Sequence, residues 1–152
     1  MQSLFKNIGN LQFETIFSSE EKCLEYLAGV KWKDGFYCRK CGHNNFCKGK
    51  KAYSRRCTRC KTEESATAHT IFHKCKFPLI EAFKITYLVC HNPGISSYRL
   101  SDNIHLRQMT CWKFKKKIAD CISRRGDIEL FEKENLKKNP SGKNQKAPTF
   151  SG

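Results

Sequence analysis

Two Cys-x-x-Cys pairs constrain this chain more than any other feature. Cys38 and Cys41 form the first pair, Cys57 and Cys60 form the second, and fifteen residues separate them. This spacing is typical of a site in which four thiolates bind one zinc ion tetrahedrally. The intervening residues are enough for a strand, a turn and a returning strand. We therefore predict a zinc ribbon of the β-hairpin type, with one structural Zn²⁺ as its cofactor.

Other interpretations of these cysteines remain open from spacing alone. They could be unrelated buried or disulfide cysteines that happen to fall in this pattern. His43 and Cys47 lie between the pairs and are further potential ligands, although two pairs already complete a tetrahedral site. Paired Cys-x-x-Cys turns also hold a single iron ion in rubredoxin-like electron carriers. The basic residues around the pairs argue against that alternative.

The positive charge of the chain is clustered. The 152 residues carry a formal net charge of +15. Residues 31–61 hold eleven Lys/Arg and one acid, among them Arg55 and Arg56, and residues 105–125 hold seven Lys/Arg and one acid. A solubilising surface explains high charge but not its clustering, so we expect a polyanionic partner, with nucleic acid as the first candidate.

The sequence also indicates a compartment. We see no signal peptide and no apolar stretch near the roughly 18 residues of a membrane helix. Ten cysteines without a secretion signal fit a reduced metalloprotein better than a disulfide scaffold. We expect a cytoplasmic protein, nucleoid-associated when bound to DNA, with no membrane partner.

The pattern before and within the ribbon predicts its elements. Residues 1–17 form a weakly patterned lead-in. Ser18 and Glu21 match a capping box, which predicts a helix from there to about Val30. Phe36-Tyr37 is the expected first ribbon strand and 52–56 the returning strand. A last strand and a loop are expected within 62–72.

Three helices are predicted after the ribbon. Pro78 and the apolar spacing that follows it predict a helix over 78–91. Ser96 or Ser97 caps a short helix to about Asn103, and a third runs from about Arg107 to Ser123, with the apolar stripe Cys111, Phe114, Ile118 and Cys121.

A short second helix and a basic third are the pattern of a helix-turn-helix unit. Gln108 and Thr110 would then reach base edges, while Arg107, Lys113, Lys116 and Lys117 contact phosphates. A plain amphipathic helix with a solvated basic face is the alternative.

The fold class predicted is therefore α+β in small domains: an N-terminal helix with the four-cysteine ribbon at 18–73, then the three-helix unit at 74–125. From Gly126 the chain loses periodicity, and 136–152 has the Lys-, Asn-, Gly- and Pro-rich composition of a disordered basic tail.

Several motifs, in order, resemble the N-terminal half of bacterial insertion-sequence transposases that begin with a zinc ribbon (DDE-type, ISXO2-like). The resemblance covers about residues 11–125. In that family the ribbon and helix-turn-helix help to bind the terminal repeats of the element, and an RNase H-like domain then performs strand cleavage and transfer. The matching stretches are 17–27, 32–43, Cys57-Thr-Arg-Cys60, 65–74 and 94–118.

This sequence departs from the family pattern at named positions. His69 and His105 stand where the family usually has glycine, and Arg107 stands at a capping serine. Residues 126–152 look like a remnant of the start of the catalytic domain, but Phe131 occupies the position of the first catalytic aspartate. Phenylalanine cannot ligate Mg²⁺, so we expect no catalysis by this chain.

The leading hypothesis is a truncated transposase: a zinc-dependent fragment that binds transposon ends without catalysing transposition. One alternative is a protein-interaction module, for which an intact transposase is the expected partner. Another is an inactive pseudogene product of a decayed insertion sequence.

Overall fold

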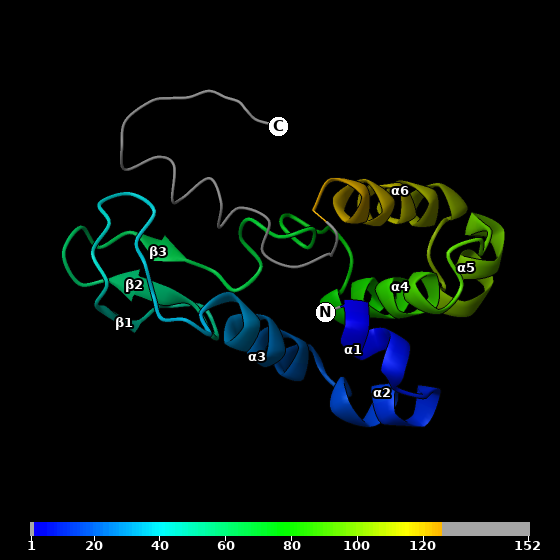
Figure 1. Ribbon diagram of the computed structural model, residues 1–152, viewed down its shortest axis with the longest axis horizontal. Helices are drawn as coiled ribbons and strands as arrows, with labels where there is room; N and C mark the ends of the chain where they lie inside the picture. The colour runs from blue at the N-terminus through cyan, green and yellow to red at the C-terminus, as the bar shows by residue number, and fades with distance from the viewer. Residues whose placement is uncertain (1, 126–152) are drawn as a thin grey trace.

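The computed structural model describes residues 2–125 and has a helical part and a small antiparallel sheet (Figure 1). The sheet and the cysteine pairs lie at one end of the molecule, and most of the helices lie at the other. The fold is therefore mixed α and β, as predicted. The elements are α1 (Gln2–Asn7), α2 (Asn10–Ile16), α3 (Glu20–Lys31), β1 (Phe46–Lys48), β2 (Arg55–Cys57), β3 (Glu63–Glu64), α4 (Leu79–His91), α5 (Ser97–Ile104) and α6 (Gln108–Arg125).

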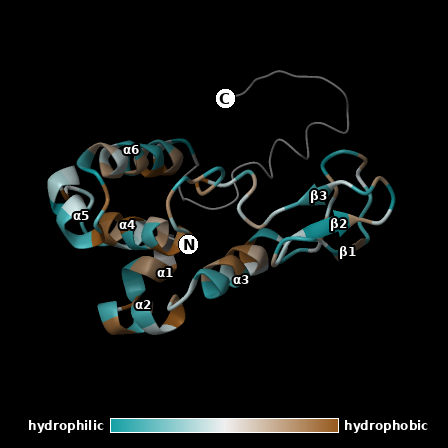
Figure 2. Ribbon diagram, turned by 180° about the vertical axis from the view of Figure 1, so that it is seen from behind, coloured by the Kyte–Doolittle hydropathy of each residue, from teal (hydrophilic) through white to brown (hydrophobic). Residues whose placement is uncertain are grey.

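Helix α4 is the centre of the helical part. Its sequence is predominantly apolar, and part of it is brown, the hydrophobic colour, in Figure 2. A helix that is apolar on most sides is stable in water only when other elements bury it. Helix α4 is in contact with α1, α3, α5 and α6. The helix predicted over 78–91 is confirmed at Leu79–His91, with Pro78 as its N-terminal cap residue.

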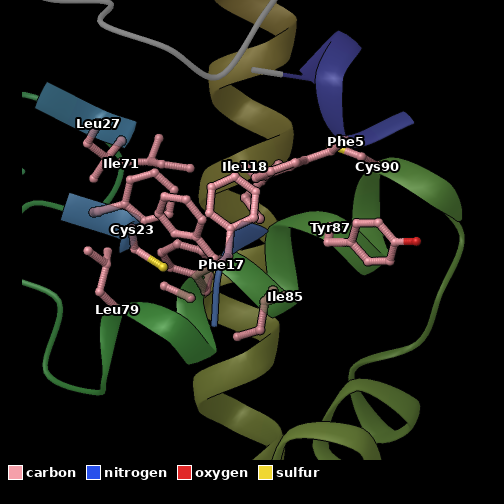
Figure 3. Packing of buried hydrophobic residues seen from close by; sticks show 14 of the residues in the cluster. Phe5, Phe17, Cys23, Leu27, Ile71, Leu79, Ile85, Tyr87, Cys90 and Ile118 are labelled. Atoms are coloured by element: carbon pink, nitrogen blue, oxygen red, sulfur yellow. The ribbon is translucent and has the colours of Figure 1, made fainter. Parts of the chain in front are cut away.

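The lead-in predicted for residues 1–17 contains two short helices that belong to this core. Phe5, Phe13 and Phe17 are buried, and Phe17 packs edge-on against Phe83 of α4 with 5.0 Å between ring centroids. Figure 3 shows Phe17 among buried side chains of other elements. Helices of six and seven residues are too short for periodicity to be visible, so only their packing on α4 defines them.

Helix α3 connects this core to the sheet. Its cap is Ser19, not the predicted Ser18: the Ser19 side chain accepts a hydrogen bond of 3.2 Å from the amide of Lys22. The helix buries Cys23 and Leu27 and ends at Lys31. Glu20 in its first turn accepts hydrogen bonds from the amides of Leu79 (2.9 Å) and Ile80 (2.6 Å), so it caps α4 as well.

The ribbon strands differ from the prediction. Phe36-Tyr37 is not a strand; the order is β1-β2-β3, antiparallel, with Phe46 opposite Cys57 and Arg55 opposite Glu64. Phe36 is instead buried, packing on Phe46 at 5.4 Å. The returning strand begins at Arg55 because Ser54 still closes a turn onto Lys51. The strand and loop expected in 62–72 are confirmed, with β3 at Glu63–Glu64.

Helices α5 and α6 follow the predicted boundaries closely. Ser96 caps α5 by accepting from the amide of Arg99, and α6 begins at Gln108. The apolar stripe of Cys111, Phe114, Ile118 and Cys121 is buried, as predicted. No helix in the range 2–125 has the length and apolar character of a membrane span. The predictions for residues 126–152, including Phe131, lie outside the described residues.

Candidate metal centre and basic surfaces

Each cysteine pair sits on a tight turn with the same backbone pattern. In the first turn the amide of Gly42 donates to the carbonyl of Cys38 (2.9 Å), and the amide of Cys38 donates to the carbonyl of His43 (2.8 Å). In the second turn Lys61 donates to Cys57 (3.1 Å), and Cys57 donates to Thr62 (2.9 Å). The two turns are therefore equivalent, and both aim their cysteines at the same point.

The structure brings the four predicted cysteines together. Sγ of Cys38 lies 3.5 Å from Sγ of Cys60, and Sγ of Cys41 lies 3.5 Å from Sγ of Cys57. All four sulfurs lie within 4.8 Å of one another. Tetrahedral zinc with Zn–S bonds of about 2.3 Å requires sulfurs about 3.8 Å apart, so the spacing fits a zinc-binding site.

Hydrogen-bond donors stabilise negative charge on two of these sulfurs, those of Cys57 and Cys60. The amides of Arg59 and Cys60 donate to Sγ of Cys57 at 3.3 and 3.4 Å. Oγ1 of Thr62 lies 3.2 Å from Sγ of Cys60, and its hydroxyl and amide lower the pKa of Cys60 to about 6. Thiolates are the form that binds zinc, so this environment favours metal binding.

The other potential ligands named from the sequence lie outside the cluster. His43 points Nε2 at Oγ1 of Thr58, 3.1 Å away, and Cys47 is exposed on β1. Within residues 2–125, the four cysteines are the one group of three or more potential ligands with converging donor atoms.

The comparison with protein-family models agrees with this geometry. Residues 18–63 match the family model described as the transposase zinc-ribbon domain. This stretch is similar to a transposase zinc ribbon. The match spans α3, both cysteine turns and the start of β3, so it includes all four cysteines of the centre. Comparisons with curated proteins and with solved structures gave no significant match.

The two arginines predicted to contact DNA in the ribbon are engaged within it. The guanidinium of Arg55 lies over the rings of Trp32 (4.7 Å) and Phe46 (4.0 Å), and burial lowers its pKa. Nε of Arg56 donates to the carbonyl of Lys61 at 3.3 Å. Both side chains are half-buried. Arg55 of β2 contacts Phe46 of β1 and Trp32 at the end of α3, so it joins these three elements.

Helix α6, with Arg107 just before it, presents the second set of predicted contact residues. Arg107, Lys113, Lys116 and Lys117 are exposed, and Thr110 is half-buried. Gln108 is held differently: its Nε2 donates to Oγ of Ser97 on α5 at 2.5 Å. That bond fixes α6 against α5 and turns the amide of Gln108 away from the open face.

Two exposed apolar residues on α6 were not singled out as site residues from the sequence. Met109 is 54% exposed and Trp112 is 46% exposed, next to the exposed lysines. The ammonium of Lys116 lies 5.5 Å from the centroid of the Trp112 ring. Met109 and Trp112 lie about one helical turn apart and off the buried stripe. Packing against the core does not account for two large apolar residues there, so the sequence already contained a signal for this exposed apolar pair.

Proposed function

We propose that this chain binds double-stranded DNA at transposon ends, through its zinc ribbon and a helix-turn-helix formed by α4–α6, and does not catalyse transposition. The observation that carries the proposal is the match of residues 18–63 to a transposase zinc ribbon, joined to a helix that exposes a row of lysines. Cys38, Cys41, Cys57 and Cys60 hold one structural Zn²⁺. When bound, the metal supplies no reaction; it fixes the two turns relative to each other.

The shape of α5–α6 supports the helix-turn-helix assignment. Helix α5 has eight residues and is followed by the C-cap residue His105, whose backbone is left-handed (φ 61°, ψ 33°). Ser101 Oγ donates to the carbonyl of Leu106 at 2.5 Å, which closes the turn before α6. A short helix, a tight turn and a basic helix are the parts that place a recognition helix in the major groove.

The exposed side of α6 then meets DNA. Lys113 and Lys116 lie on its open face opposite the buried stripe and contact phosphates. Met109 and Trp112, on the same N-terminal half, are placed for apolar contacts with base edges. Gln108 acts through Ser97 and positions the helix.

A binding role without strand transfer is supported by Phe131. Where the resembling transposases carry an aspartate that binds Mg²⁺, a phenylalanine side chain offers no ligand atom. Incubating the protein with Mg²⁺ and end-labelled terminal-repeat duplex tests this part. We expect no cleaved strand; cleavage that depends on the protein would contradict it.

The binding role is tested by fluorescence anisotropy with a terminal-repeat duplex. The variant Lys113→Gln/Lys116→Gln should bind roughly tenfold more weakly than wild type, because each lost phosphate contact removes part of the electrostatic free energy. The control variant Lys6→Gln/Lys22→Gln changes charge equally on exposed residues of α1 and α3 and should bind like wild type. A wild-type protein that does not bind duplex DNA at micromolar concentration would sink the proposal.

A further inference from the structure

A trough lies between the ribbon and the loop that leads to α4. One hollow of about 630 Å³ is lined by Lys40, Lys50 and His69, among others, and a second of about 470 Å³ by Lys74 and the start of α4. Lys51, Ser65 and His73 line both, so the two hollows adjoin. In Figure 1 the loop between β3 and α4 connects the ribbon end of the molecule to the helical end.

The carboxylates that line this trough are already engaged. Glu63 accepts from Oγ of Ser54 (2.7 Å) and from the amide of Lys51 (3.2 Å), which hold its pKa at about 2. Glu64 pairs with Nζ of Lys31 at 2.6 Å and with Nε of Arg39 at 3.2 Å. Glu20, at the other end, caps α4.

The ammonium groups of the trough have no such partners. Lys40, Lys50, Lys51 and Lys74 are exposed, and none of them pairs with a carboxylate of residues 2–125. They approach the trough from both sides, since Lys50 and Lys51 come from the turn of the hairpin and Lys74 comes from the loop. The trough therefore has an excess of positive charge and of hydrogen-bond donors, which suits a phosphate chain.

The loop places its side chains here at a cost in backbone strain. His69 (φ 62°) and Lys74 (φ 54°) both adopt the left-handed region that favours glycine. Between them, Thr70 is 3% exposed and Ile71 and Phe72 are each 1% exposed, so this part of the loop is packed into the core while His69 and His73 stay exposed. The rings of His69 and His73 lie parallel, with centroids 6.1 Å apart. Strain that the surroundings hold in place is typical of functional positions.

We propose that this trough binds the phosphodiester backbone of one DNA strand as it passes from the ribbon toward α6. The inference rests on the proposed function and adds a third contact between the two basic ends of the molecule. Lys117 of α6 lies near enough for its charge to act on His73, so positive potential continues from the trough to that helix. The lysines and histidines offer donors to phosphate oxygens and no base-reading pattern, so binding here is independent of sequence.

The test compares two double variants of the full zinc-loaded chain. Lys51→Gln/Lys74→Gln removes one ammonium from each side of the trough. Lys6→Gln/Lys22→Gln removes the same charge from exposed residues elsewhere. Affinity for a terminal-repeat duplex is measured over a range of salt concentrations. We expect the slope of log Kd against log salt to fall by about 2 in the trough variant and to stay at the wild-type value in the control.

Ethylation interference on the same duplex gives a second readout. Phosphates whose ethylation blocks wild-type binding should become tolerant of it in the trough variant, at positions that the control leaves unchanged. The inference is overturned if wild type binds DNA but the trough variant keeps its slope, or if both variants lose slope equally. Absence of any wild-type binding would overturn the proposed function itself.

Discussion

Gly42 and Lys61 occupy equivalent positions in the two cysteine turns. Each donates its amide to the carbonyl of the first cysteine of its pair, and each has a positive φ, 78° for Gly42 and 66° for Lys61. Glycine adopts this conformation freely, but lysine does so at a cost. One turn of the metal centre is relaxed and the other is strained.

Replacing Lys61 by glycine should therefore stabilise the zinc-loaded protein by about 0.5–1 kcal/mol, because it relieves the left-handed backbone. The opposite change, Gly42→Ala, should destabilise it by about 1 kcal/mol, since it introduces that cost. A Cβ at Gly42 would also meet Oη of Tyr37 at 3.4 Å. Denaturant unfolding of the three proteins measures both effects. A Lys61→Gly variant less stable than wild type would contradict the equivalence.

An ion pair between Lys31, at the end of α3, and Glu64, in β3, links the helix to the ribbon. Nζ of Lys31 is 2.6 Å from Oε2 of Glu64, and it also donates to the carbonyls of Ser65 (2.8 Å) and Ala68 (2.6 Å). The side chain of Lys31 is 3% exposed. Replacing Lys31 by methionine keeps the apolar stem but removes the ammonium from three half-buried acceptors, Glu64, Ser65 and Ala68.

We expect Lys31→Met to lower the free energy of unfolding by about 2–3 kcal/mol, since it leaves Glu64 with Arg39 as its ion-pair partner and removes the donor to two carbonyls. The matched control is Lys22→Met, at an exposed position of the same helix, and it should change stability by less than about 0.5 kcal/mol. Denaturant unfolding measures both variants. Equal effects of the two substitutions would show that the pair does not hold α3 to the ribbon.

The same lysine gives the protein a pH dependence. Burial lowers the pKa of Lys31 to about 8, from 10.5, even though Glu64 opposes the shift. Between these values the unfolded chain binds more protons at this residue than the folded chain does, so stability rises as pH increases. The difference in unfolding free energy between wild type and Lys31→Met should therefore grow from pH 8 to pH 10. A constant or shrinking difference would contradict this assignment.

The cysteines should differ in reactivity when zinc is bound. Cys47 is exposed and should react rapidly with iodoacetamide, whereas Cys23 is buried and its pKa is raised to about 12 by that burial. Peptide mass spectrometry should show the four ribbon cysteines protected until a chelator is added, and then alkylated. Structural zinc contributes on the order of 10 kcal/mol to folding, so the ribbon should lose its structure with the metal. Rapid alkylation of these cysteines in the presence of zinc would contradict metal binding.

The sequence predicted the parts of the molecule that local patterns define. Cysteine spacing identified the cluster because tetrahedral coordination restricts how far apart the pairs can lie. Pro78 and Ser96 marked the starts of α4 and α5 because their side chains fit first-turn or cap geometry. His69 and His105, which stand where the resembling family usually has glycine, have φ values of 62° and 61°.

The remainder depended on contacts between distant segments. Phe36 was predicted to lie in a strand. In the structure its ring packs on that of Phe46, and the chain continues into the first cysteine turn without forming a strand. Arg55 looked like a free contact residue, but the rings of Trp32 and Phe46 lie on its guanidinium. Likewise, the bond of Gln108 to Ser97 joins two helices, so no pattern within α6 alone revealed it.

The central claim is that a zinc-held ribbon and α6 together bind DNA, and one measurement tests it most directly. The affinity of the full chain for a terminal-repeat duplex is measured by anisotropy with zinc bound, after chelation, and after zinc is restored. Our account predicts salt-sensitive binding with zinc, roughly tenfold or more weaker binding without it, and recovery on reconstitution. Equal affinity of the zinc-loaded and zinc-free protein, or no binding in either state, would contradict it.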